Sequence, residues 1–284
     1  MAHRQSALVR ESTAALPCPP PGAGASFGEL LRYWRARRHE SQLGLALAGG
    51  VSARHVSFLE TGRARPSTEM VSRLTEALRL PLRERNALFV AAGFVPRHDE
   101  RPMTAPALAA ARHAVEFILN QQEPFPAFVL SRHWDLVMRN RASERVFGWL
   151  LRGRKRQANI MRSVFDDEGL RPLVVNWDEV ALDMLAHLEN QVRHVPSDAV
   201  ASALLREILT LPNVPARAQP DGARPAPLLT AIYAREGREL RFFSTLATFG
   251  TPNDVTLEEL CIECMFPADD ATREFCRALA APPS

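Results

Sequence analysis

The stretch that decides the fold of this chain is SQLGLALAGGVSARHVSFLETG, which occupies residues 41–62. It contains two short helical patterns with a pair of glycines between them. Ser41 precedes the first pattern and Ser52 the second, and a serine in front of an apolar periodic segment is a helix N-cap. Gly50 is the predicted turn residue, because glycine tolerates the backbone conformation that a tight turn needs. The stretch therefore predicts two short helices joined by a tight turn.

Three more helical patterns surround this stretch. Ser26 and Glu29 form a capping box, so the first helix begins directly after Ser26. The pair Pro66-Ser67 precedes the fourth helix, and Pro81 precedes a fifth helix that ends before Gly93. Five short helices joined by turns of a few residues predict a compact all-α domain over residues 27–96.

Charge is divided unevenly along the chain. Residues 27–97 contain twelve arginines and six glutamates, a net charge of +6, although the whole chain carries only +3. Residues 98–284 therefore carry −4, once the +1 of residues 1–26 is counted. A basic first part joined to a mildly acidic second part is typical of a DNA-binding module attached to another domain. Chance clustering is the alternative explanation, so charge alone does not decide between them.

The first domain resembles the helix-turn-helix of the phage repressor and Cro class, the XRE family. The resemblance depends on Gln42 at the start of the second helix, Ala46 at the helix crossing, the glycine turn, and Leu-Glu-x-Gly at residues 59–62. It implies a lambda-repressor-like fold that binds DNA. In the family the glutamate of the last motif pairs with an arginine of the first helix. The resemblance therefore implies a structural ion pair between Arg35 and Glu60.

The third helix is the predicted recognition helix. Such a helix exposes its first turn to base edges while later residues, here Val56 and Leu59, anchor it in the core. Arg54 offers a fork of donors to guanine, with phosphate contact alone as the alternative. The predicted base contacts are Ala53, Arg54 and Ser57. The predicted phosphate contacts are Gln42, Ser52, His55, Arg63 and Arg65, of which the last two could instead be plain solvated charges.

One such domain buries too little surface for a full operator, so a homodimer on a palindromic site in double-stranded DNA is expected. Around the domain, the proline-rich residues 1–26 are predicted to be a disordered tail, and residues 97–106 a linker. A helix over about residues 107–121 follows and opens a second domain, predicted to span residues 107–280.

The second domain changes to a strand-like pattern near Pro126. Alternating apolar residues predict a hairpin there, and further strands are expected at residues 228–236, 239–249 and 256–266. Helical patterns cover about residues 140–151, 157–165, 177–194 and 198–210, and a final helix starts near Asp269. Five strands with helices inserted between the second and third predict an α+β domain with one antiparallel sheet.

The second domain is similar to the ligand-binding domain of MmyB-like regulators. The similarity lies in the segments FPAF at 125–128, WDL at 134–136, NRA at 140–142, FST at 243–245, FGTP at 249–252 and FPAD at 266–269. It implies a PAS-like sensor fold with a site for a small apolar, fatty-acid-like effector. From the residues themselves, the candidate pocket lining is Phe128, Trp134, Leu136, Phe243, Phe249, Ile262 and Phe266. An ordinary core is the alternative, since strand aromatic residues are usually core.

Other classes of protein find little support. No Walker loop, serine elbow or His-Glu-x-x-His motif is present, so no enzyme and no cofactor are predicted. Cys261 and Cys264 would point to opposite faces of a strand, which disfavours a metal site, and His187 and His194 are expected at the surface. No window of about 18 or more apolar residues suggests a membrane span. The four cysteines are too few and too unevenly placed for a disulfide framework, which favours a protein of the reducing cytoplasm.

The sequence thus predicts a dimeric transcription regulator whose second domain senses a small molecule. Two alternatives stay open at this point: an enzyme tethered to DNA, and an antitoxin-type interaction module without a small ligand. A polar cleft with clustered titratable groups would favour the enzyme. A solid core with a large exposed apolar patch would favour the interaction module.

Overall fold

The computed structural model describes residues 24–195, 197–212, 214–215 and 228–281. The chain forms two compact units that divide after Arg97, and each is considered by itself. The tail predicted for residues 1–26 lies outside the described residues except for its last three positions.

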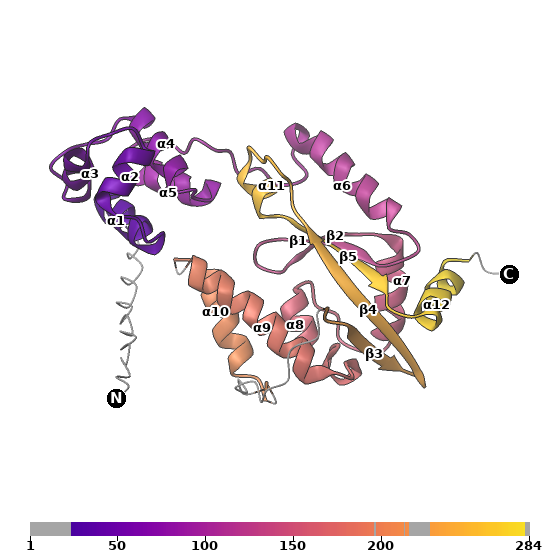
Figure 1. The fold of residues 1–284 in the computed structure, drawn as a ribbon. Helices are drawn as coiled ribbons and strands as arrows, with labels where there is room; N and C mark the ends of the chain where they lie inside the picture. Colours follow the sequence, from indigo (N-terminus) through magenta and orange to yellow (C-terminus); the bar gives the residue numbers. More distant parts are fainter. Residues whose placement is uncertain (1–23, 196, 213, 216–227, 282–284) are drawn as a thin grey trace, which may run out of the picture. The chain divides into compact units, whose positions relative to one another are not determined.

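The first unit consists of five helices (Figure 1): α1 (Phe27–Arg37), α2 (Gln42–Ala48), α3 (Ala53–Glu60), α4 (Thr68–Ala77) and α5 (Leu82–Ala91). Each of the first four begins after a serine whose hydroxyl accepts the backbone N–H three residues further on. The capping box at Ser26 and Glu29 is present. The predicted all-α helix-turn-helix fold is therefore confirmed, and serine caps set where its helices begin.

Two glycines shape the helix-turn-helix. Gly50, between α2 and α3, has a φ of +66°, which costs glycine little and other residues more. Gly28 lies where α1 crosses the end of α3, and a Cβ atom there would be 2.6 Å from the Leu59 carbonyl oxygen. The two helices can approach this closely only because position 28 has no side chain.

The second unit is built on one antiparallel five-stranded sheet in the order β2-β1-β5-β4-β3. The strands are β1 (Ala127–Leu130), β2 (Leu136–Arg139), β3 (Ala231–Arg235), β4 (Arg238–Ala247) and β5 (Cys261–Pro267). The helical elements are η1 (Pro106–Leu108), α6 (Ala109–Gln121), α7 (Arg141–Leu150), α8 (Ile160–Phe165), η2 (Arg171–Leu173), α9 (Trp177–His194), α10 (Ala199–Leu209), α11 (Val255–Glu259) and α12 (Asp270–Ala280). The predicted α+β class is confirmed.

The prediction of a strand over residues 256–266 is wrong for the first half of that range. That half is the short helix α11, because the Asp254 carboxylate caps the Thr256 N–H at 2.9 Å and so opens a helical turn. Buried Val255 fixes the turn against the unit. The strand β5 begins only at Cys261.

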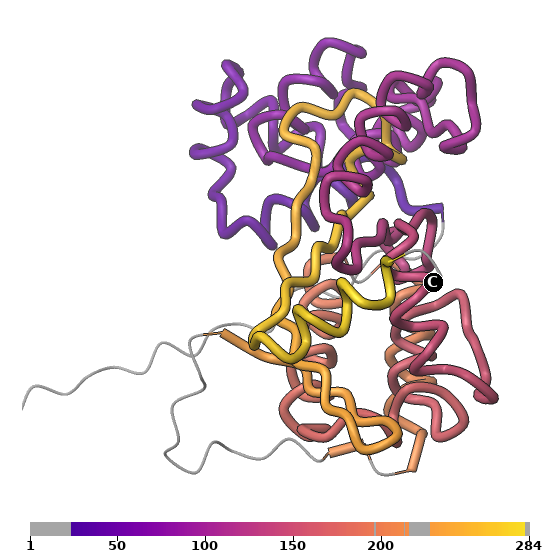
Figure 2. Tube along the Cα trace, turned by 90° about the vertical axis from the view of Figure 1, so that its right-hand side faces the viewer, coloured from indigo at the N-terminus to yellow at the C-terminus, as the bar shows by residue number. Residues whose placement is uncertain are grey.

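The two faces of the sheet carry different layers. On one face α6 packs through Val115 and Leu119 against Val129 and Ile262. The helices inserted between β2 and β3 cover the other face and share the larger core with Phe242. Figure 1 shows α8–α10 on one side of the strands and α6 on the other, and Figure 2 shows β4 and β5 running along one side of the unit. A cavity lies in this larger layer.

Candidate DNA-binding surface and ligand cavity

The recognition helix α3 has one buried and one accessible side. Val56, Leu59 and Glu60 are buried, whereas the Arg54 side chain is exposed. Ala53, His55 and Ser57 are half-buried. The residues predicted to meet base edges therefore share the accessible side, and Val56 and Leu59 hold the opposite side in the core.

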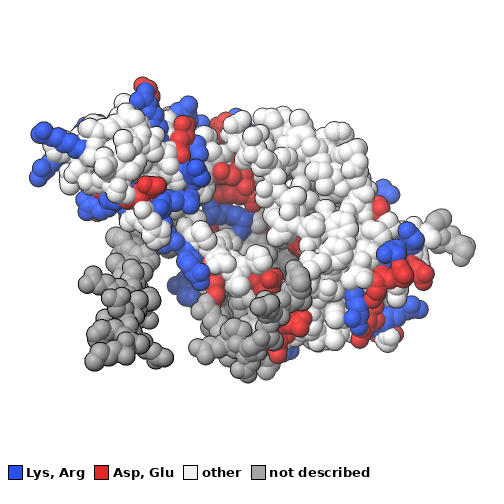
Figure 3. Space-filling view, in the orientation of Figure 1, with Lys and Arg blue, Asp and Glu red and all other residues white. Residues whose placement is uncertain are grey.

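Two residues of this helix have partners inside the protein. The Arg54 guanidinium lies over the Phe58 ring, with its Cζ 5.1 Å from the ring centroid, which holds the side chain along the helix by a cation–π contact. The Ser52 hydroxyl accepts the His55 N–H at 3.2 Å and is the N-cap of α3. Arg63 and Arg65 are exposed just after the helix, and Figure 3 shows basic side chains, which are all arginines in this unit, at many points of its surface.

Glu60 joins three helices at the buried end of α3. Its carboxylate accepts from Arg35 Nε at 2.6 Å and from Gln42 Nε2 at 2.8 Å. Its backbone carbonyl accepts from Arg32 Nη2 at 2.9 Å. The structure thus brings Arg35 and Glu60 together, and it gives Gln42, expected among the phosphate contacts, a partner within the protein for one of its two N–H groups.

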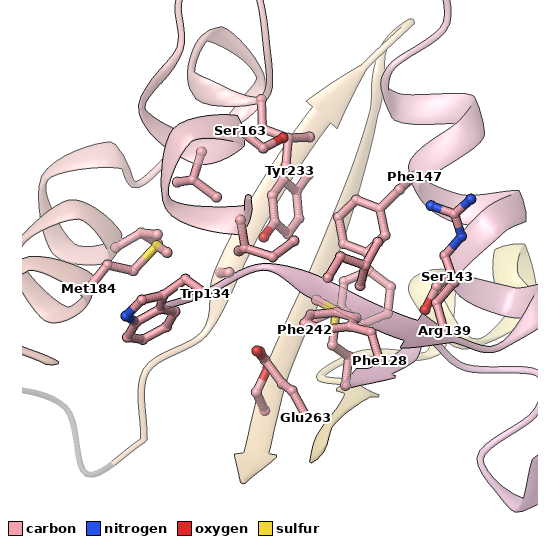
Figure 4. Close-up of a pocket in the computed structure, with 18 of the residues that line it drawn as sticks. Phe128, Trp134, Arg139, Ser143, Phe147, Ser163, Met184, Tyr233, Phe242 and Glu263 are labelled. Atoms are coloured by element: carbon pink, nitrogen blue, oxygen red, sulfur yellow. The ribbon is translucent and has the colours of Figure 1, made fainter. Parts of the chain in front are cut away.

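The second unit contains a cavity of about 630 Å³, within the usual range for small-molecule sites. It lies between the sheet and helices α7, α8 and α9 (Figure 4). Most of its wall is apolar, and the side chains that contribute include Phe128, Phe147, Val180, Met184, Phe242 and Met265. A wall of this kind favours a ligand with a large apolar part.

The cavity contains three of the seven residues predicted to line it, namely Phe128, Trp134 and Leu136. The other four are not at the cavity. Phe243 and Phe266 stack on each other with ring centroids 5.4 Å apart, while Phe249 and Ile262 belong to the small core under α6. Successive side chains of a strand point to opposite faces, and in β4 and β5 the neighbours of the predicted residues face the cavity.

The cavity also holds titratable side chains that were not predicted. Glu263 on β5 and both Asp183 and His187 on α9 contribute to the wall. His187 Nδ1 lies 3.5 Å from an Asp183 carboxylate oxygen. The hydrogen bond with Asp183 is the main cause that raises the pKa of His187 to about 9. Their spacing of four residues on a helix was the sequence signal for this pair.

Two arginines border another part of the wall. Arg139 Nε lies 3.2 Å from a Glu144 carboxylate oxygen, whereas Arg156 makes a long hydrogen bond of 3.5 Å to the Gly148 carbonyl. Within the described residues Arg156 has no carboxylate partner. One positive charge at the wall is therefore available to an acidic group.

The described residues hold no group of three or more His, Cys, Asp or Glu side chains placed to bind a metal ion. Cys261 and Cys264 are free thiols, and burial raises the pKa of both. Among these residues no helix has the length and apolar character to cross a membrane.

Comparison with known proteins gives the following matches. The model of the MmyB-like transcription regulator ligand binding domain matches residues 111–279, and a helix-turn-helix family model matches residues 31–85. The clp gene regulator ClgR from C. glutamicum is 28% identical over 26% of this chain and 92% of its own, with a TM-score of 0.22. An RNA-binding light-oxygen-voltage receptor is 11% identical over 89% of this chain and 62% of its own, with a TM-score of 0.26. No curated protein matches.

The two family matches agree with the two units of the fold. The helix-turn-helix model falls on the basic five-helix unit that contains α3. The other model covers the sheet and the cavity beside it. The chain therefore belongs to the MmyB-like transcription regulators and is a DNA-binding regulator with a ligand-binding domain.

Proposed function

We propose that this protein is a homodimer that binds a palindromic operator in double-stranded DNA and changes its operator affinity when a small, largely apolar molecule occupies the cavity. The observation that carries the proposal is the presence, on one chain, of an exposed recognition helix and an apolar cavity of about 630 Å³. A ligand shifts DNA affinity only if it favours one arrangement of the dimer over another.

The DNA contacts in this proposal come from α3 and its surroundings. Ala53, Arg54 and Ser57 contact base edges. The phosphate contacts are Gln42, Ser52, His55, Arg63 and Arg65. Gln42 makes its contact through the second N–H of its side chain. This division assigns specificity to the first group and salt-dependent affinity to the second.

The proposed effector is fatty-acid-like. The apolar wall accommodates an alkyl chain, and Arg156 provides a charge-assisted partner for a carboxylate. Because most of the cavity wall is apolar, such a contact with Arg156 would fix the orientation of the ligand in the cavity.

The outer face of α6 supports the homodimer. Opposite its buried stripe, this helix presents a row of uncharged residues at Ala110, Ala114, Phe117, Ile118 and Gln121. Phe117 is 58% exposed and Ile118 36%, although a surface helix usually has a polar outer face. An uncharged face can meet its own copy across a twofold axis without placing like charges together. We propose this row as the dimer contact.

Phe117→Glu is expected to convert the dimer to a monomer at micromolar concentration, because the new carboxylate would meet its symmetry mate across an apolar contact. Analytical ultracentrifugation of the full chain measures the change. Ala109→Glu, at an exposed position of α6 that is not part of the row, is the matched control and stays dimeric. A monomeric wild-type protein on operator DNA would overturn the homodimer. A Phe117→Glu protein that remains dimeric would overturn α6 as its contact.

A further inference from the structure

Glu263 lies on the cavity wall, most of which is apolar. It is in β5, and its cross-strand neighbours are Phe128 on β1 and Leu246 on β4. All three side chains line the cavity, and Figure 4 shows the Glu263 carboxyl group pointing into it. A carboxyl group between two apolar cross-strand neighbours gains no polar partner from them, so its burial costs free energy.

The described residues provide Glu263 with one hydrogen-bond partner, the Ser244 side chain on β4. Its surroundings include Tyr233 on β3 and the pair Asp183 and His187 on α9. His187 is paired with Asp183 at 3.5 Å, and both side chains are about half exposed, so solvent screens its positive charge. Glu263 has no counter-charge of its own within hydrogen-bond distance among these residues.

Burial is the main cause that raises the pKa of the Glu263 carboxyl. The Ser244 hydrogen bond and then the charge of His187 act in the opposite direction, and the nearby Asp183 adds the smallest effect, which raises the pKa. Loss of hydration disfavours the charged form of a carboxyl group and so favours its protonated form. The protonated acid then has one O–H donor directed at the cavity or at Ser244.

We propose that Glu263, as an uncharged carboxylic acid, donates a hydrogen bond to a neutral oxygen of the ligand. The ligand is then an oxygenated amphiphile, such as an alkyl or acyl chain with a hydroxyl, keto or ester oxygen, and not a plain hydrocarbon chain. This inference rests on the proposed ligand site and adds to it. The apolar wall selects the chain, Arg156 donates to an acidic end, and Glu263 recognises an oxygen at a different point, because Glu263 lies on β5 and Arg156 in the loop before α8.

Glu263→Gln and Glu263→Leu separate this role from the alternatives. Glutamine keeps a neutral donor of the same shape, whereas leucine removes the donor. Calorimetric titration of the full-length protein with octan-1-ol is expected to give similar affinity for wild type and Glu263→Gln, within about threefold. Glu263→Leu is expected to bind octan-1-ol about tenfold more weakly, as the loss of one hydrogen bond predicts. Glu239→Gln, at an exposed position on β4 away from the cavity, is the control.

The pH dependence gives a second measure. Octan-1-ol affinity of the wild type is expected to fall at high pH as Glu263 ionises, whereas the affinity of Glu263→Gln stays flat. A wild type that prefers octylamine, with the preference lost in Glu263→Gln, would overturn the neutral acid and indicate a carboxylate that binds cations. Equal octan-1-ol affinity in wild type, Glu263→Gln and Glu263→Leu would overturn Glu263 as an anchor and leave the proposed ligand site unaffected. Absence of binding by octan-1-ol, octylamine and octanoate alike would overturn both the inference and the proposed ligand site.

Discussion

Replacing Glu60 by alanine is expected to lower the free energy of unfolding of the first unit by about 3 kcal/mol, because removing one partner of a buried ion pair leaves the other charge uncompensated. The Glu60 side chain is only 1% exposed, and the Arg35 side chain 16%. Gln42 would also lose its acceptor. Hydrogen exchange of residues 27–96 in the full-length protein, measured by mass spectrometry, reports the change in that unit directly.

Glu69→Ala is the matched control. Glu69 pairs with Arg73 one turn away on α4, and both side chains are more than half exposed. Exposed pairs of this kind contribute less than about 0.5 kcal/mol. A loss of equal size in the two variants would contradict the view that Glu60 ties α1 and α2 to the recognition helix.

Arg54→Ala is expected to have the largest effect on DNA recognition. A bidentate arginine–guanine contact contributes about 1–3 kcal/mol of discrimination, and a dimer loses one such contact in each half-site. Affinity for the specific site should therefore fall by at least about tenfold, while affinity for unrelated DNA changes little. A specific duplex can be selected from a random pool with the full-length protein. Fluorescence anisotropy then measures the affinity for this duplex and for random duplex.

The comparison with Arg63→Ala distinguishes base contact from phosphate contact. If Arg63 contacts only phosphate, its removal weakens binding to both duplexes to the same extent and lowers the salt slope by about one unit. Arg54→Ala should leave that slope nearly unchanged. Equal losses on specific and random DNA for Arg54→Ala would contradict its place at the base edges.

The first unit was predictable because its signals are local. Four serine caps and the glycine turn mark the helix boundaries in the sequence itself, so the five helices follow from neighbouring residues. The contacts of Glu60 with Arg35 and Gln42 join residues far apart in the chain. The expectation of the Arg35 contact came from family resemblance and not from spacing.

The cavity was less predictable because the face of a strand is a tertiary property. In β4 and β5 two bulky apolar residues follow one another, Phe242 with Phe243 and Met265 with Phe266. Alternation shows that the members of each pair face opposite sides, but it does not show which side has the cavity. Glu263 was not predicted to line the cavity for the same reason, because a polar residue in an alternating strand is normally assigned to the solvent-exposed face.

The central claim is that the cavity controls operator binding. The most direct measurement is the operator affinity of the full-length protein with and without saturating octan-1-ol or octanoate, whichever calorimetry shows to bind more tightly. We predict a shift of at least about fivefold, the lower end of typical allosteric coupling. In Ala231→Trp, where a ring on β3 takes up part of the cavity, we predict operator affinity without ligand near that of the wild type and a smaller shift at the same ligand concentration. An operator affinity that stays constant while ligand binding is saturated, or an equal shift in Ala231→Trp, would contradict the account.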